Sequence, residues 1–354
     1  MRSLVNTAVR PAAVAAPSTD AADFHAALPG YRPTPVHVLP AVATELGLGA
    51  VALKDESDRL GQPAFKVLGA SWAVERALRE QPGVQTLVAA SAGNHGRAVA
   101  HVAAQRALGC RVYLPARSAA ARREAIAAEG AEIVVVVDGD YEDAVARAAN
   151  DARTHADAIE IADVGDSGPA HWVIDGYATL FAETAAQASF DVILVPVGVG
   201  SLAAAAARFA AAARLAVVGV EPVAAGCLTA SLAAGEPTSV PTPGTAMAGL
   251  DCAQVSTAAW PSLRDGIQGT VTVDDAEVHA AMRQLAATGL AIGESGAAPL
   301  AALRALAAEP ECSALRDVVG LGSEARVVCV ATEGPTDPEA YRRALVQDRP
   351  PPTP

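Results

Sequence analysis

Residues 87–96, with the sequence LVAASAGNHG, pass from a short apolar run into a turn of small residues and then toward an alanine-rich segment. The apolar run predicts a buried strand over 86–90, and the segment after the turn predicts a helix to about residue 107. The same alternation predicts further strands at 51–53, 111–114, 133–137, 191–197, 217–220 and 327–331. Helices are predicted between them at 71–79, 119–129, 141–155, 202–213, 277–287 and 299–308. Continuous Val, Ile and Leu strands separated by helices are typical of parallel sheets covered on both faces, so the sequence predicts an α/β fold.

The composition restricts the class of protein. The chain has 354 residues, 51% of them hydrophobic, and a formal net charge of −13. This length allows two compact lobes, each with its own core. The negative charge, without any basic cluster, argues against nucleic acid or an anionic membrane as a partner. No apolar run reaches the length of a membrane span.

The cysteines and the chain ends point to a protein of the cytoplasm. The five cysteines lack metal-ligand spacing, which predicts a mostly reduced protein without a metal site. A bond between Cys227 and Cys252 remains open. Residues 1–17 have the character of an ordinary or frayed start and not of a signal peptide. The Pro-rich tail 349–354 is predicted to be disordered.

Lys66 is one of only two lysines, whereas 24 of the 26 basic residues are arginines. Arginine stays protonated and cannot form a Schiff base, so a chain that favours arginine is expected to keep lysine where an amine is needed. Lys66 lies in the segment 62–71, QPAFKVLGAS, among apolar and small residues that disfavour an ammonium group. The stretch fits a catalytic amine, and it fits a half-buried lysine at a helix start equally well.

The turn at residues 91–96, SAGNHG, is a candidate binding site. Small residues between a strand and a helix leave backbone N–H groups for an anion such as a carboxylate. The amide of Asn94 suits a phenolic or carbonyl oxygen. The structural alternative is a plain tight turn with Asn94 in left-handed geometry and His95 capping the helix. The rarity of the string favours a functional site.

Other strand ends and loops carry further candidates. Residues 197–201, VGVGS, join a strand to a helix, and their N–H groups with the helix N-terminus suit a phosphate. The strand 327–331 ends at Thr332, whose hydroxyl would point into a site at the carboxyl ends of the strands. An ordinary strand-end threonine is the alternative. Asp163 and Asp166 lie in a polar loop, where a solvated position is the simpler interpretation.

The glycine turn also supports a competing function. Gly198, Gly200 and Ala203 fit the G-x-G-x-x-A fingerprint of dinucleotide-binding folds. Glu221 ends the next strand at the spacing of a ribose-binding acid. An NAD-dependent oxidoreductase is therefore an alternative, although it leaves Lys66 unexplained.

The chain resembles the fold-type II pyridoxal-phosphate (PLP) enzymes in the order of four features: a lysine, an Asn turn, a glycine turn and a Thr near the C-terminus. The resemblance is closer to diaminopropionate ammonia-lyase than to the threonine and serine dehydratases, and it extends from about Phe24 to Tyr341. The matching segments are 29–35 (PGYRPTP), 54–57 (KDES), 64–69 (AFKVLG), 93–97 (GNHGR), 175–180 (DGYATL), 219–222 (GVEP), 247–250 (MAGL), 293–296 (GESG) and 332–334 (TEG). The resemblance implies two doubly wound parallel-sheet lobes with PLP in the cleft between them, and a homodimer. It implies a larger PLP-binding domain, 1–80 plus 176–354, and a smaller substrate-side domain, 81–175.

The resemblance also implies a role for each matching residue. Lys66 would hold PLP through a Schiff base and take the Cα proton of an L-amino acid. Asn94 would bond the ring oxygen of the cofactor, and Thr332 would bond its pyridine nitrogen. Asp163 would be a second carboxylate that meets the leaving amino group, and the short loop keeps Asp166 open for this role. The phosphate would be bound by Gly198, Val199, Gly200 and Ser201, and the substrate by Ser91, Ala92, Gly93 and His95.

One residue departs from the pattern. The ammonia-lyases carry Asp immediately before the Gly-Asn-His-Gly turn, as the base for the D-isomer, and here that position is Ala92. A methyl group cannot take a proton, so turnover of the D-isomer is not expected. The predicted reaction is α,β-elimination of L-2,3-diaminopropionate to pyruvate and ammonia. Dehydration of L-serine or L-threonine is the alternative, and a non-catalytic PLP-binding protein is an alternative from another class.

Overall fold

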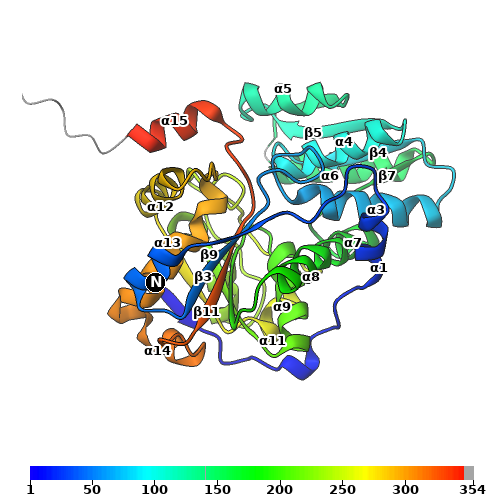
Figure 1. Ribbon diagram of the computed structural model, residues 1–354. Helices are drawn as coiled ribbons and strands as arrows, with labels where there is room; N and C mark the ends of the chain where they lie inside the picture. Colours follow the sequence, from blue (N-terminus) through cyan, green and yellow to red (C-terminus); the bar gives the residue numbers. More distant parts are fainter. Residues whose placement is uncertain (140, 347–354) are drawn as a thin grey trace, which may run out of the picture. The chain divides into compact units, whose positions relative to one another are not determined.

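The computed structural model describes residues 1–139 and 141–346 (Figure 1). Packing divides the chain into two compact units. The larger unit contains residues 1–17, 33–64 and the chain from Leu180 onward, and the smaller unit contains 18–32 and 65–179. Each unit is built on its own sheet with helices packed on it, as the predicted α/β class requires.

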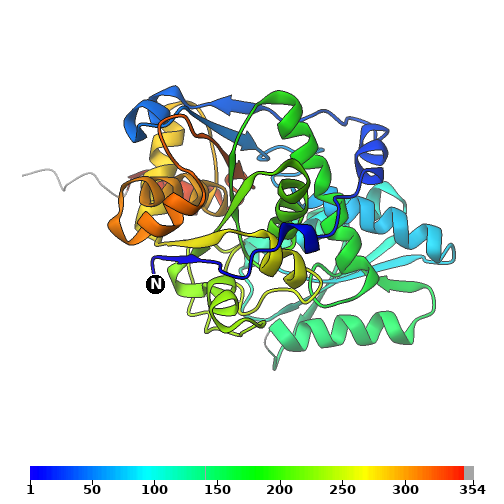
Figure 2. The ribbon, with the colours of Figure 1, turned by 90° about the horizontal axis from the view of Figure 1, so that it is seen from below.

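The larger unit has a seven-stranded sheet in the order β1-β10-β9-β8-β11-β3-β2. The five inner strands are parallel, whereas β1 and β2 pair antiparallel at the two edges. In Figure 2 the dark-blue N-terminal segment with β1 lies beside the yellow segment that contains β10. The strands are β1 Ser3–Val5, β2 Val36–Val38, β3 Ala50–Asp55, β8 Val192–Pro196, β9 Ala216–Pro222, β10 Gly269–Val273 and β11 Arg326–Ala331.

Helices cover both faces of this sheet. Figure 1 shows α12, α13 and α14 on one side and α8, α9 and α11 on the other. This burial explains why the inner strands are continuous apolar runs. The helices are α2 Pro40–Leu46, α8 Ala178–Gln187 (from Leu180 on in this unit), α9 Ser201–Ala213, α10 Cys227–Ala234, α11 Trp260–Gly266, α12 Asp275–Ala287, α13 Glu294–Ala308, α14 Ser313–Val318 and α15 Pro338–Val346.

The smaller unit has a four-stranded, wholly parallel sheet in the order β6-β5-β4-β7. Its strands are β4 Thr86–Ala90, β5 Gly109–Pro115, β6 Glu132–Val136 and β7 Ala158–Glu160. Its helices are α1 Asp20–Ala26, α3 Lys66–Glu80, α4 Asn94–Gln105, α5 Ala120–Ala128, α6 Tyr141–Thr154 and α7 Gly168–Gly176.

Strand β4 passes directly into the turn that the sequence singles out. Val88 and Ala90 of β4 form a core cluster with Ala148 of α6. After the turn, α4 returns so close to the strand end that a Cβ atom on Gly96 would lie 2.3 Å from the carbonyl oxygen of Ser91. Only glycine fits this approach, so Gly96 fixes how α4 starts.

Most predicted elements occur with similar bounds, but two helices begin five residues earlier than predicted. The helix predicted at 299–308 begins at Glu294, so that Pro299 lies inside it. The helix predicted at 71–79 begins at Lys66. Gly69 favours a loop by propensity, but here it lies where α3 packs on α7. A Cβ atom on Gly69 would lie 2.6 Å from the ring of Tyr177. Tertiary packing therefore outweighs the propensity of this glycine. The sequence patterns did not predict the strands β1, β2, β7 and β10, or the helices α1, α2, α7, α8, α10, α11, α14 and α15.

The packing units overlap the predicted domains in large part, and the domain ranges themselves stay a prediction. The smaller unit includes 18–32 and α3, in addition to the predicted range 81–175. Helix α3 packs mainly on α7 and α4, which explains why it belongs with them.

Three further expectations concern cysteines, membranes and the tail. Cys227 and Cys252 do not form a disulfide with each other. In the described part of the chain, no helix combines the length and the apolar character needed to cross a membrane. The tail 349–354 lies outside the described residues.

Candidate functional site

The first group of candidate residues surrounds Lys66 in the smaller unit. Lys66 is the first residue of α3, and its Nζ atom lies 2.8 Å from Oδ2 of Asp163. The two side chains are only 20% and 10% exposed. The Nζ atom also lies 5.4 Å from the ring centre of Phe65 and 6.0 Å from that of Tyr177. Lys66 thus combines a carboxylate partner with an aromatic, largely dry environment.

The two aspartates that the sequence left open have different environments. Asp163 follows the end of β7 and is buried beside Lys66. The side chain of Asp166 is 73% exposed and pairs with His171 at 2.9 Å. The structure therefore brings Asp163, and not Asp166, together with the lysine.

The electrostatics keep Asp163 ionised. Burial by itself raises the pKa of this carboxyl group. The positive charges nearby, His95 when protonated and Lys66, together with the hydrogen bond from Lys66, outweigh burial and lower the pKa of Asp163 to about 2. Asp163 is consequently a carboxylate at neutral pH.

The Asn94 turn lies at the start of α4. Gly93 has an extended backbone, and its N–H donates to Oγ of Ser91 at 3.2 Å. Ala92 is partly exposed, and Asn94 is the first helical residue. His95 is only 3% exposed, and its Nε2 atom lies 2.7 Å from the carbonyl oxygen of Ile161. Neither a left-handed Asn94 nor a His95 cap is present, because α4 begins at Asn94 itself.

The glycine turn in the larger unit has the form of an anion cradle. Gly200 is left-handed, with φ +92°, and α9 starts at Ser201. A Cβ atom on Gly198 would lie 2.6 Å from the carbonyl oxygen of Gly249, so this position also requires glycine. Within the described residues, the backbone N–H groups of Gly198, Val199 and Gly200 have no hydrogen-bond acceptor. Three such donors at the start of a helix suit a phosphate.

Thr332 directly follows β11, and the two residues after it bond to the chain at Pro63 and Ala64. Glu333 pairs with Ala64 across an isolated bridge, and the N–H of Gly334 donates to the carbonyl oxygen of Pro63 at 3.0 Å. Thr332 is almost fully buried. These backbone bonds hold the end of β11 against Pro63 and Ala64 within the larger unit.

Comparison with known proteins assigns the family. The model of the pyridoxal-phosphate dependent enzyme family matches residues 27–333. The chain belongs to this family. The prediction made from the motifs, with PLP as cofactor, is thereby confirmed.

The chain is similar to individual proteins that are ammonia-lyases or dehydratases. The diaminopropionate ammonia-lyase of Salmonella typhimurium is 33% identical, over 90% of this chain and 89% of that protein. The crystal structure of the diaminopropionate ammonia lyase from Escherichia coli, in complex with an aminoacrylate-PLP azomethine reaction intermediate, matches with a TM-score of 0.88 at 30% identity. That match covers 98% of this chain and 96% of that chain. An L-threonine dehydratase of Corynebacterium glutamicum is 34% identical over 59% of this chain and 48% of that protein. The fold-type II architecture is confirmed by these likenesses.

The residues present fit PLP. The cofactor has an aldehyde that requires an amine, and Lys66 provides one. Its phosphate requires several donors, which the N–H groups of Gly198, Val199 and Gly200 provide. Thr332 carries a hydroxyl, which suits a ring atom of the cofactor.

Glu221 does not fit the competing dinucleotide interpretation. Its carboxylate is fully buried and accepts hydrogen bonds from the N–H of Leu228 at 2.6 Å and from the N–H and hydroxyl of Thr229 at 2.8 and 2.6 Å. These bonds tie Glu221 to the start of α10 and leave it unable to receive a ribose. Membership of the PLP-dependent family agrees with this placement.

Sequence reasoning assigned no role to the second lysine. Lys54 is fully buried, and its Nζ atom lies 2.8 Å from both Oε2 of Glu183 and the carbonyl oxygen of Thr34. Arg59, also fully buried, pairs in bidentate fashion with Glu56 and with Glu183 at 2.6–2.8 Å. Two positive and two negative charges thus form one buried cluster. A second lysine in a chain that otherwise uses arginine was the sequence signal that could have revealed this buried cluster.

A buried histidine near the start of α3 was also missed. His25 Nδ1 lies 2.8 Å from the hydroxyl of Thr179, and its Nε2 lies 3.0 Å from the carbonyl oxygen of Leu68. Because these residues are far apart in sequence, no local sequence pattern predicts the contact. The imidazole fixes the first turn of α3, which carries Lys66.

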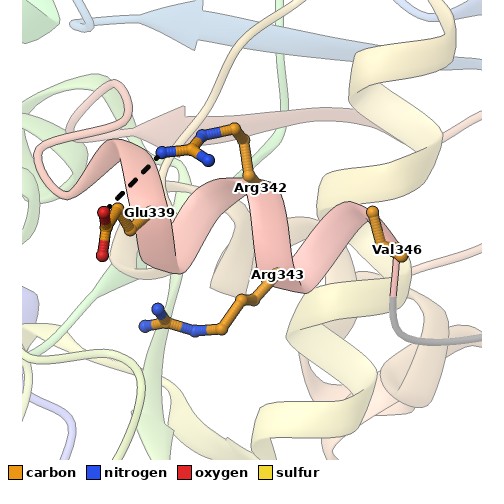
Figure 3. Close-up of a pocket in the computed structure, with 4 residues that line it drawn as sticks. All are labelled: Glu339, Arg342, Arg343 and Val346. Atoms are coloured by element: carbon orange, nitrogen blue, oxygen red, sulfur yellow. Dashed lines mark ion pairs between the residues drawn. The ribbon is translucent and has the colours of Figure 1, made fainter.

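A surface hollow on α15 lies apart from these residues in sequence. It is lined by Glu339, Arg342, Arg343 and Val346, with Nη2 of Arg342 4.0 Å from Oε1 of Glu339 (Figure 3). No candidate site residue lines it.

Proposed function

We propose that this chain is a PLP-dependent ammonia-lyase that converts L-2,3-diaminopropionate to pyruvate and two molecules of ammonia. The observation that carries the proposal is the ion pair between Lys66 and Asp163. It joins an amine able to bind PLP to a carboxylate able to receive a second ammonium group. The names of the two diaminopropionate ammonia-lyase relatives support the same substrate.

Lys66 is the proposed base. When bound, PLP draws electrons from the Cα atom of the substrate and makes its proton removable. The side chain of Lys66 rises from the first turn of α3, so the helix holds its backbone while four single bonds let the amine reach the proton. General-base catalysis of this kind contributes about 10²–10⁴ in rate.

Asp163 is the proposed receptor for the leaving group. Because its pKa is about 2, it accepts hydrogen bonds at neutral pH and has no proton to donate. The second amino group of diaminopropionate arrives as an ammonium and needs only an acceptor. A hydroxyl group departs readily only when an acid protonates it. Asp163 therefore favours nitrogen over oxygen as the leaving atom.

The remaining candidate residues have proposed binding roles. Asn94 bonds the ring oxygen of the cofactor, and Thr332 bonds the pyridine nitrogen. A hydroxyl at that nitrogen, in place of a carboxylate, does not hold it protonated, which favours elimination over transamination. The larger unit binds the cofactor phosphate through Gly198, Val199, Gly200 and Ser201. The smaller unit binds the substrate through Ser91, Ala92, Gly93 and His95.

Dehydration of L-serine or L-threonine is the second candidate function. The L-threonine dehydratase relative supports it, as does the resemblance of the string at 91–95 to that enzyme family. The charge of Asp163 argues for the ammonia-lyase. We further propose a cytoplasmic homodimer, as the family resemblance and the reduced cysteines suggest.

The test is release of 2-oxo acid and ammonia by the purified, PLP-loaded protein. The substrates are L- and D-2,3-diaminopropionate, L- and D-serine and L-threonine. Turnover of L-diaminopropionate with two ammonia molecules per pyruvate supports the lyase. Turnover of the hydroxy-amino acids alone establishes a dehydratase. Bound PLP without turnover of any substrate contradicts both.

A further inference from the structure

The imidazole of His95 has a fixed orientation and one atom without a partner. His95 lies in the first turn of α4 and is 3% exposed. Its Nε2 atom is 2.7 Å from the carbonyl oxygen of Ile161, which can only accept, so Nε2 carries a proton. The opposite atom, Nδ1, is buried and has no hydrogen-bond partner among the described residues. An imidazole with one proton on Nε2 presents a lone pair at Nδ1.

This lone pair faces the carboxylate of Asp163. His95 Nδ1 lies 3.8 Å from Oδ2 of Asp163. Burial lowers the pKa of His95 and outweighs the nearby carboxylate, so the ring stays neutral. Two acceptors therefore lie side by side in a buried place, an arrangement that is unfavourable unless a donor lies between them.

The structure already contains an ammonium group on one of these two acceptors, the carboxylate of Asp163. Lys66 Nζ donates to Oδ2 of Asp163 at 2.8 Å, the same oxygen that faces His95. Asp163 thus already accepts a hydrogen bond from an ammonium group, while His95 Nδ1 beside it has no such bond within the described chain. When the Lys66 nitrogen holds the cofactor, it can no longer supply this ammonium.

We infer that His95 Nδ1 and Asp163 Oδ2 together form the receptor for the ammonium leaving group of the substrate. The inference rests on the proposed function and deepens it. An ammonium has enough N–H donors to bond both acceptors at once, whereas a hydroxyl has a single donor and satisfies only one. His95 thereby becomes a specificity-determining residue, which binds the leaving nitrogen and transfers no proton. The arrangement discriminates diaminopropionate from serine.

A matched pair of variants separates the two bonds of this imidazole. In His95→Gln the side-chain amide reaches the position of Nε2 and keeps the bond to Ile161, but the acceptor at Nδ1 is lost. In His95→Asn the amide oxygen stands near the position of Nδ1 and the bond to Ile161 is lost. We expect His95→Gln to lower kcat/KM for L-diaminopropionate about 10- to 100-fold, the size of one lost hydrogen bond to a charged group. The kcat/KM for L-serine should fall less than about threefold, because its hydroxyl bonds only one of the two acceptors.

His95→Asn should lower kcat/KM for L-diaminopropionate and for L-serine by a similar factor, so the ratio of the two values should stay the same. The inference is overturned if His95→Gln lowers kcat/KM equally for both substrates, because that result identifies a purely structural histidine.

A second measurement needs no turnover. The cofactor-free Lys66→Ala variant lacks the native ammonium, and ethylammonium can be added in its place. We expect the ¹⁵N resonance of His95 Nδ1 to report an unprotonated nitrogen and to shift as ethylammonium is titrated in. In Lys66→Ala/Asp163→Asn the shift should vanish. A protonated Nδ1, or a resonance unmoved by ethylammonium, refutes the acceptor pair. If the wild type turns over no substrate, the proposed function fails, while this titration still decides the receptor.

Discussion

Lys66 and Asp163 are 97 residues apart in the sequence, and their side chains form an ion pair with 2.8 Å between Nζ and Oδ2. One residue begins a helix and the other lies in a loop after a short strand. Their burial strengthens the interaction, since charges removed from water are less screened. This pair is the point on which the proposed chemistry depends.

Asp163→Asn should lower kcat/KM for L-diaminopropionate about 100-fold, because the leaving ammonium loses its charged acceptor. Activity on L-serine, if present, should fall by a smaller factor. Initial rates of pyruvate formation measure both. The matched control is Asp166→Asn, an exposed aspartate paired only with His171 among the described ion pairs, which should stay within about twofold of wild type. Equal losses in the two variants would contradict the role of Asp163.

Much of the fold was predictable because it depends on local patterns. The strands β4, β8 and β11 are largely apolar runs, and each is followed within three residues by a glycine. Buried parallel strands produce this pattern wherever helices cover both faces of a sheet. The candidate residues at strand ends follow from the same rule, since ligands bind at the carboxyl ends of parallel strands.

The remaining features depend on contacts between distant residues. The start of α3 at Lys66 was missed, since Gly69 looks like a helix breaker until Tyr177 packs against it. The choice between Asp163 and Asp166 was open because both lie in one polar loop and only tertiary structure buries one of them. The acceptor at His95 Nδ1 becomes visible only with the bond to Ile161.

Lys54→Met should destabilise the cofactor-free protein by about 3–5 kcal/mol, the usual cost of breaking a buried ion pair from one side. The fully buried cluster would then hold Glu56 and Glu183 against a single Arg59. Urea unfolding, followed by circular dichroism, measures the change. The double variant Lys54→Met/Glu183→Gln restores charge balance and should recover at least half of the loss. A double variant as unstable as the single one would show that packing, and not charge, is responsible.

Glu160→Gln should change how stability depends on pH. Burial raises the pKa of Glu160 from 4.5 to about 7. Between these values the folded protein keeps a proton that the unfolded chain has released, so the free energy of unfolding falls as the pH rises. The variant removes this contribution and should be about 1–2 kcal/mol more stable than wild type at pH 8, allowing for the partial exposure of the side chain.

Urea unfolding at pH 5 and pH 8 tests this expectation. Glu132→Gln, which removes an exposed glutamate on β6, serves as the control for the loss of a carboxylate from the same sheet. Part of the slope should persist in Glu160→Gln, because burial also raises the pKa of Glu221 to about 7. An unchanged slope in Glu160→Gln would mean that this carboxyl group ionises normally in the folded protein.

Ala92→Asp should give the protein activity on D-2,3-diaminopropionate. Ala92 lies immediately before Gly93 and Asn94. The ammonia-lyase pattern that this sequence resembles has an aspartate at this position. The wild type has only a methyl group there and should turn over the L-isomer alone. A carboxylate at this position supplies a base on the other side of the substrate, and general bases contribute about 10²–10⁴ in rate. Pyruvate release from each pure isomer measures the effect, with Ala92→Asn as a control of similar size that has no base. Equal turnover of both isomers by the wild type would instead make Asp163 the first residue to test as the base for the D-isomer.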